Sequence, residues 1–143
     1  MAVWAMAGSP IFFDGDCRKM DPQTLALLTM TEVLEINSAA SNRTQLYALL
    51  DGGIRTGGAF TAARSVGGSN VRYVLLLHPP GDDYPPPLPR MTIEWRGFGL
   101  PAASVCSVRD VFTNASLGHQ LQGNVTINVN DSFVLVAVEE CTA

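Results

Sequence analysis

The chain of 143 residues has little charge and no long apolar run. Only 15% of its residues are charged, and its nine Lys and Arg are scattered along a chain of net charge −4. Without a basic stripe, nucleic acid is not an expected partner. The most apolar segments, residues 71–77 and 133–138, are far shorter than the ~20 residues of a membrane-spanning helix.

Residues that bind metals or attack substrates are also scarce. His78 and His119 are far apart and three cysteines match no zinc spacing, so neither a metal nor another cofactor is expected. The Gly-X-Ser-X-Gly elbow and the phosphate-binding glycine loop are missing. One disulfide is conceivable, and Cys106 with Cys141 is the favoured pair because both fall in the β-rich part, which leaves Cys17 over.

Asparagine, by contrast, occurs repeatedly in the pattern that accepts N-linked glycans. Four of the seven asparagines begin an Asn-X-Ser/Thr sequon: Asn42, Asn114, Asn124 and Asn130. One interpretation is a β surface rich in Asn, Ser and Thr. The other is a glycoprotein of the secretory route, lysosome-like or extracellular. The N-terminus lacks the pattern of a signal peptide, so this second interpretation requires a signal upstream in the parent protein.

The first 37 residues follow the periodicity of a small α/β unit. A helix is expected over residues 2–7, ending before Pro10, and the continuous apolar run 11–13 predicts a strand buried on both faces. Asp21 can cap a second helix with Pro22 at its first position. Another helical turn is expected at residues 31–36.

From about residue 45 the pattern changes to short strands between turns. The strands are expected at residues 45–50, 59–66, 72–78, 91–95, 105–112, 124–130 and 133–138. Strict alternation over 124–130 places Val125, Ile127 and Val129 on one face and the asparagines on the solvent face. The fold class is therefore mainly β: an antiparallel β-sandwich over 45–143, preceded by a partial α/β segment over 1–44.

Two carboxylates follow the expected strand at 11–13. Asp14 and Asp16 are two residues apart, which on a strand puts them on the same side, about 6.5 Å apart along the backbone. Glycosidases use carboxyl pairs about 5 to 9.5 Å apart, so a catalytic pair is one hypothesis. The alternative is a turn that caps the next segment, with Arg18 as counter-ion.

Five aromatic residues could form a platform on which sugars stack. Core and edge packing of the sandwich is the favoured interpretation of this set: Tyr47, Tyr73, Tyr84, Trp95 and Phe98.

Two long stretches resemble one family. The segment "AVWAMAGSPIFFDGDCRKMDPQTLALLTMTEVLEINS" resembles the last strand and helices of the catalytic barrel in glycoside hydrolase family 27, the α-galactosidases and α-N-acetylgalactosaminidases. The matching residues are Trp4, Ala5, Ser9, Pro10, Asp16, Arg18, Pro22, Leu27, Leu28, Glu32, Val33, Ile36 and Asn37. The stretch from "MTIEWRGFGLP" to "SFVLVAV" resembles that family's C-terminal β-domain, through Val108, Arg109, Asp110, Val111, Phe112, Leu117 and Gly118.

The resemblance implies the C-terminal part of a glycosidase that hydrolyses terminal α-D-galactosides with retention and without a cofactor. A complete barrel takes about 250 residues, and only residues 1–44 could be its remnant. The two catalytic aspartates of the family would lie on strands upstream, so the chain alone is expected to be inactive. Asp14, Asp16 and Arg18 would then lie at the rim of the pocket or behind its reactive groups.

Two further expectations follow. Residues 1–37 should pack against the sandwich, associate with another copy in a homo-oligomer, or be mobile, because they carry apolar faces that a barrel would cover. The alternative function is a truncated, non-catalytic module that binds carbohydrate or a partner.

Overall fold

The computed structural model describes residues 1–40, 47–49, 60–65, 71–77, 90–128 and 133–142. The helices are α1 (Ala2–Ala7), α2 (Pro22–Leu28) and α3 (Thr31–Ala40), with short 3-10 turns η1 (Cys17–Lys19) and η2 (Trp95–Phe98). The strands are β1 (Tyr47–Leu49), β2 (Phe60–Ser65), β3 (Arg72–Leu77), β4 (Arg90–Glu94), β5 (Val105–Asp110), β6 (Ser116–Gln122), β7 (Asn124–Asn128) and β8 (Phe133–Thr142). No helix in these ranges is long and apolar enough to cross a membrane.

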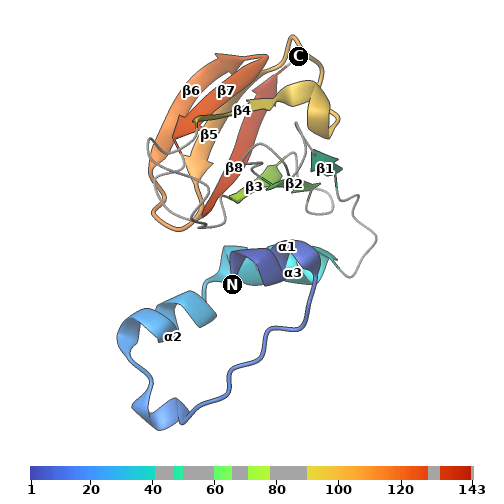
Figure 1. The fold of residues 1–143 in the computed structure, drawn as a ribbon. Coiled ribbons are helices and arrows are strands. Elements are labelled where there is room, and N and C mark those ends of the chain that lie inside the picture. The colour runs from blue at the N-terminus through green and yellow to red at the C-terminus, as the bar shows by residue number, and fades with distance from the viewer. Residues whose placement is uncertain (41–46, 50–59, 66–70, 78–89, 129–132, 143) are drawn as a thin grey trace, which may run out of the picture.

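The strands form an antiparallel sandwich, as expected from the alternating sequence (Figure 1). One sheet has six strands in the order β1-β2-β3-β8-β5-β6, and the other consists of β4 and β7. The last strand, β8, lies in the middle of the large sheet and pairs with β3 on one side and β5 on the other. The two halves of this sheet are therefore joined only through the C-terminal strand. Seven of these strands match expected segments, and β6 was not expected.

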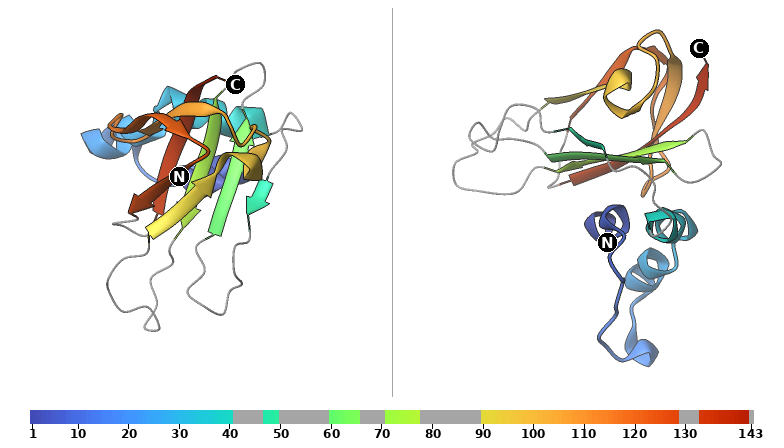
Figure 2. Two further views of the ribbon diagram at one scale, coloured as in Figure 1. Left: turned by 90° about the horizontal axis from the view of Figure 1, so that it is seen from above. Right: turned by 90° about the vertical axis from the view of Figure 1, so that its right-hand side faces the viewer.

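The central strands β3 and β8 of the large sheet are buried on both faces. One cluster lies between the two sheets and includes Trp95 with Val125 and Ile127 of β7. A second cluster lies on the opposite face, where Val33 and Ile36 of α3 pack with sheet residues. Figure 2 shows the same layering, with α1 and α3 beneath the large sheet. Helices α1 and α3 therefore pack against the sandwich, the first of the three expected arrangements, whereas α2 buries no side chain.

The helix boundaries follow from local chemistry. The Asp21 carboxylate accepts hydrogen bonds from the backbone N–H groups of Gln23 (3.0 Å) and Thr24 (2.9 Å), and Pro22 occupies the first helical position. These bonds satisfy donors that the first helical turn leaves without partners. Gly8 ends α1 in the left-handed conformation, with φ 65°. The helix expected at residues 2–7 and the start expected at Asp21 are confirmed.

The strand expected at residues 11–13 is wrong. The segment has no regular secondary structure, and Phe12 and Phe13 are 81% and 42% exposed. A strand buried on both faces needs neighbouring strands and covering layers, and none of the described strands pairs with these residues. The described residues before β1 thus form a helical segment without the strand of an α/β unit.

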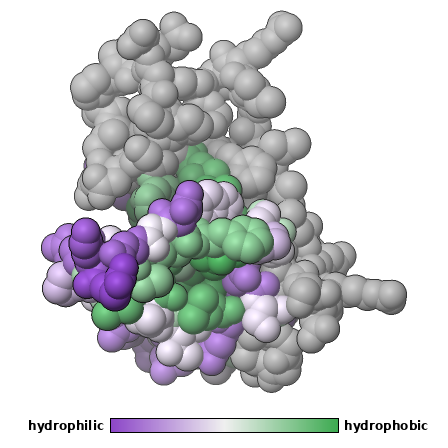
Figure 3. All heavy atoms as spheres, turned by 90° about the horizontal axis from the view of Figure 1, so that it is seen from below, coloured by the Kyte–Doolittle hydropathy of each residue, from purple (hydrophilic) through white to green (hydrophobic). Residues whose placement is uncertain are grey.

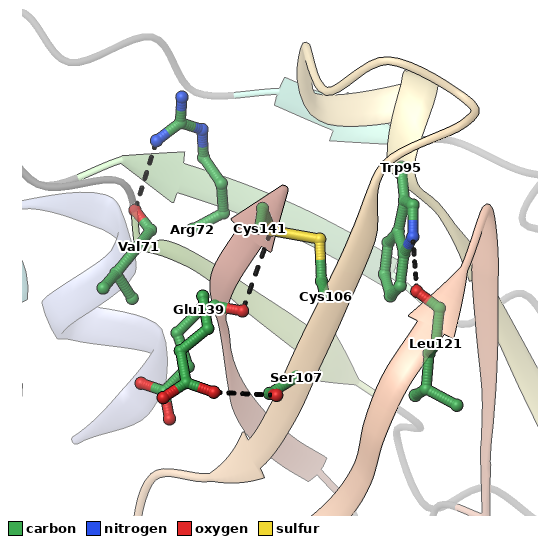
Figure 4. Close-up of a disulfide and its surroundings, with 9 residues drawn as sticks. Val71, Arg72, Trp95, Cys106, Ser107, Leu121, Glu139 and Cys141 are labelled. Carbon is green, nitrogen blue, oxygen red and sulfur yellow. Dashed lines mark hydrogen bonds between the residues drawn. A yellow bond between two sulfur atoms is a disulfide. The ribbon is translucent and has the colours of Figure 1, made fainter. Parts of the chain in front are cut away.

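A disulfide joins Cys106 of β5 to Cys141 of β8, with 4.2 Å between the Cα atoms (Figure 4). This is the pair that the β-rich positions favoured. Cys17 is a free, exposed cysteine in η1.

Candidate functional site

The loop that carries Asp14, Asp16 and Arg18 runs between α1 and α2 on the surface. Asp16 caps η1: its carboxylate accepts a hydrogen bond from the backbone N–H of Arg18 (3.1 Å) and pairs with the Arg18 guanidinium (2.9 Å). The hydrogen bond from the Arg18 side chain is the main reason that the pKa of Asp16 lies below its usual range. Asp16 and Arg18 are thus engaged with each other in the manner of a capped turn.

Phe13 and Gly15 shape the same loop. A Cβ atom on Gly15 would lie 2.6 Å from the Phe13 ring, so the ring covers the glycine closely and a larger residue would displace it. Asp14 between them is exposed. The loop therefore presents one carboxylate to solvent beside an Asp–Arg pair, groups that can bind hydroxyls but that do not enclose a catalytic pair by themselves.

A second cluster of charges joins the helices to the sheet. The Arg109 guanidinium on β5 donates two hydrogen bonds to the Glu32 carboxylate on α3 (2.7 and 3.0 Å) and two to Glu139 on β8 (both 3.2 Å). The three side chains are only 21–27% exposed. Each carboxylate is held by two nitrogens of the planar cation, the geometry in which arginine binds carboxylates best.

Tyr73 of β3 completes this cluster. Burial, followed by the negative charge of Glu32 and a hydrogen bond to its carboxylate, raises the pKa of Tyr73 well above its usual range. The pKa of Arg109 is also raised, mainly because its guanidinium donates hydrogen bonds to Glu32 and, second, to Glu139. We define these four residues as the arginine cluster. It holds one cation, two carboxylates and a phenol, so it fixes α3 on the sheet through charge-assisted hydrogen bonds.

Asn37 performs a related task at the end of α1. Its side-chain amide donates to the backbone oxygens of Trp4 (3.2 Å) and Ser9 (2.8 Å). One side chain of α3 therefore holds the C-terminus of α1 and the start of the exposed loop. Sequence reasoning marked Glu32, Asn37 and Arg109 as motif residues but did not predict their contacts.

The other candidates fall into two groups. Trp95 is fully buried, donating from its ring nitrogen to the Leu121 carbonyl (3.3 Å), and Tyr73 is 7% exposed, so neither can stack on a sugar at the surface. The structure does not describe the side chains of Tyr47, Tyr84, Phe98, His78, Asn42 and Asn130. Within the described ranges, no three His, Cys, Asp or Glu side chains come together as metal ligands.

Comparison with known proteins places these features in context. The scan of family models gave no match. The chain is 25% identical to the α-galactosidase of Coffea arabica, over an alignment 143 positions long that covers 94% of this chain and 33% of that enzyme. The crystal structure of α-galactosidase I from Mortierella vinacea superposes with a TM-score of 0.72 at 19% identity, over 96% of this chain and 33% of that chain. A candidate α-galactosidase from Bacteroides fragilis gives a TM-score of 0.68 at 13% identity, over 99% of this chain and 28% of that chain.

The resemblance to α-galactosidases is thereby confirmed, at the level of the sequence for the coffee enzyme and of the fold for the two solved structures. The chain spans about a third of the length of the relative it matches. The matches are consistent with the C-terminal part of such an enzyme. They do not test the rim role of Asp14, Asp16 and Arg18, which stays a prediction.

Proposed function

We propose that the chain is the C-terminal part of an α-galactosidase-type glycoside hydrolase, which in its complete form hydrolyses terminal α-D-galactosides with retention at the anomeric carbon. The observation that carries the proposal is the alignment of 94% of this chain with one third of the coffee α-galactosidase. The matching fold of the Mortierella enzyme over nearly the whole chain supports it.

The chemistry supports an inactive chain. Retaining hydrolysis needs two carboxyl groups about 5–5.5 Å apart, one as nucleophile and one as acid. Among the described acidic side chains near the helices, Asp16, Glu32 and Glu139 are each paired with an arginine. Asp14 is exposed on the loop. These described carboxylates are thus engaged with arginine or exposed singly, which supports a nucleophile and an acid supplied by another part of the complete enzyme.

The surface of the helical segment supports an adjoining catalytic domain. Seven large apolar side chains lie exposed in the described part of the chain before β1: Val3, Trp4, Phe12, Phe13, Leu25, Leu27 and Leu34. Figure 3 shows the apolar patch on the side of the molecule that carries the helices. A contiguous apolar surface of this kind is typical of a surface that another part of a protein covers.

The test is hydrolysis of 4-nitrophenyl α-D-galactoside by the pure chain, with the coffee enzyme as positive control. We expect no turnover above that of a heat-inactivated sample. Turnover that remains after further purification would refute the expectation that the chain alone is inactive. A chimera in which this chain replaces the matching third of the coffee enzyme then tests the proposed role, and α-galactosidase activity of the chimera is the expected result.

A further inference from the structure

Asn124 has no evident structural task in the fold. It begins β7, opposite Glu94 of β4, and its side chain is exposed. Its amide makes no hydrogen bond to any part of the chain that the structure describes. Asn37 offers the contrast, because its amide holds two backbone carbonyls and it does not begin a sequon.

The second sequon asparagine in the described ranges, Asn114, does have a conformational reason to be asparagine. It lies in the turn between β5 and β6 with φ 58°, a left-handed conformation that asparagine tolerates better than most residues. Asn124 instead starts an extended strand, where asparagine is an unfavourable residue. Asn128 is exposed on the same strand without beginning a sequon, so the feature that sets Asn124 apart is its exposed sequon.

The surroundings of Asn124 suit a bulky, hydrated group. The side chains that the structure describes as exposed on the two-stranded sheet are all polar: Arg90, Thr92, Glu94, Asn124, Thr126 and Asn128. The residues between them, Ile93, Val125 and Ile127, point into the core. A group attached to Asn124 would therefore project from the outer layer of the sandwich, on the side away from α1 and α3.

The disulfide provides independent support. A bond between Cys106 and Cys141 forms and persists in the oxidising environment of the secretory route. That route is also where Asn-X-Ser/Thr sequons receive glycans.

We propose that Asn124 carries an N-linked glycan that covers the outer face of the β4–β7 sheet and leaves the apolar face of the helices open. The modification joins the Asn124 side-chain nitrogen, which gives up a proton, to the anomeric carbon of the first sugar; the bond from that sugar to the phosphate of a lipid-diphosphate donor breaks, and the lipid diphosphate leaves. The proposal stands independently of the galactosidase assignment.

The experiment uses the full chain with a cleavable secretion leader in cultured eukaryotic cells. Total chain, secreted and retained, is treated with peptide N-glycosidase in water labelled with oxygen-18. Tandem mass spectrometry then reads position 124, and we expect labelled aspartate there. Unlabelled asparagine at this position would overturn the proposal.

Sequon variants provide matched controls. Thr126→Val should remove the label at Asn124, whereas Thr126→Ser should keep it, because serine completes a sequon as well. Ser116→Ala, which abolishes the Asn114 sequon only, should leave the Asn124 label unchanged. Retention of the label in Thr126→Val would contradict an enzymatic glycan and count against the proposal.

Discussion

The arginine cluster predicts a specific departure from additivity. Arg109 is shared between Glu32 and Glu139, and its Nη2 donates to both carboxylates. Glu32→Gln or Glu139→Gln alone leaves one cation with one anion, so Arg109 keeps a carboxylate partner. The double variant leaves Arg109 without a carboxylate in a site where it is only 21% exposed.

The magnitudes follow from the burial of these side chains. We expect each single variant to lower the free energy of unfolding by about 1 kcal/mol. This value lies between the cost of losing an exposed ion pair and the cost of losing a buried one. A buried charge without its partner costs about 3–5 kcal/mol, so the double variant should lose about 3 kcal/mol. The excess over the sum of the singles is then on the order of 1 kcal/mol.

Urea denaturation followed by far-UV circular dichroism measures all three variants against the parent. The matched control is Glu94→Gln, which removes the exposed pair of Glu94 with Arg96 and should change stability by less than about 0.5 kcal/mol. If the double variant costs no more than the sum of the two singles, within about 0.5 kcal/mol, Arg109 is not shared in the way described.

Three further predictions concern separate elements. Replacing both Cys106 and Cys141 with alanine should lower the free energy of unfolding by roughly 3–4 kcal/mol, because the unfolded chain gains the entropy of a loop with a separation of 35 residues. Guanidinium denaturation measures this loss, and an unchanged midpoint would contradict the prediction. Burial and Glu32 raise the pKa of Tyr73, so its contribution to stability is complete below the unfolded pKa of about 10 and is lost as pH rises above it. Absorbance at 295 nm should accordingly show fewer ionised tyrosines at pH ~11 in the folded parent than in urea, and the deficit should be smaller by one tyrosine in Tyr73→Phe. Asn37→Ala should cost about 1–3 kcal/mol by leaving the Ser9 carbonyl without its described donor, with faster amide hydrogen exchange in α1; the Trp4 carbonyl keeps the backbone N–H of Ser9. Asn128→Ala at an exposed site should leave stability and exchange unchanged.

The sequence predicted elements whose signal is local. Asp21 and Pro22 mark a helix start by side-chain chemistry, and alternation over 124–128 predicts which side chains face the core. Both signals act within a few residues of the chain. Both elements can therefore be recognised without knowledge of the tertiary structure.

The predictions of other elements failed because the environment of these elements is set by distant residues. The run 11–13 is apolar enough for a strand, but none of the described strands lies beside it to pair. The strand β6 lies at the edge of the large sheet and is mostly polar, so it lacks the apolar pattern of a core strand.

The arginine cluster shows the same limit at the candidate site. Glu32 and Arg109 are 77 residues apart, and nothing in either local sequence specifies the other as its partner. The resemblance marked both residues as typical of the family. Only the structure shows that they meet and hold a helix on a sheet.

The burial of the central strands β3 and β8 on both faces bears on how this chain could be exchanged between proteins. Strands β3 and β8 carry four consecutive buried residues each, which face two different cores. A gene rearrangement that moved the sandwich without α1 and α3 would expose Leu75, Leu135 and Ala137 of the second cluster to water. The two helices and the sheet would thus have to be inherited together, so a break in the gene is better tolerated before α1 than between α3 and β1.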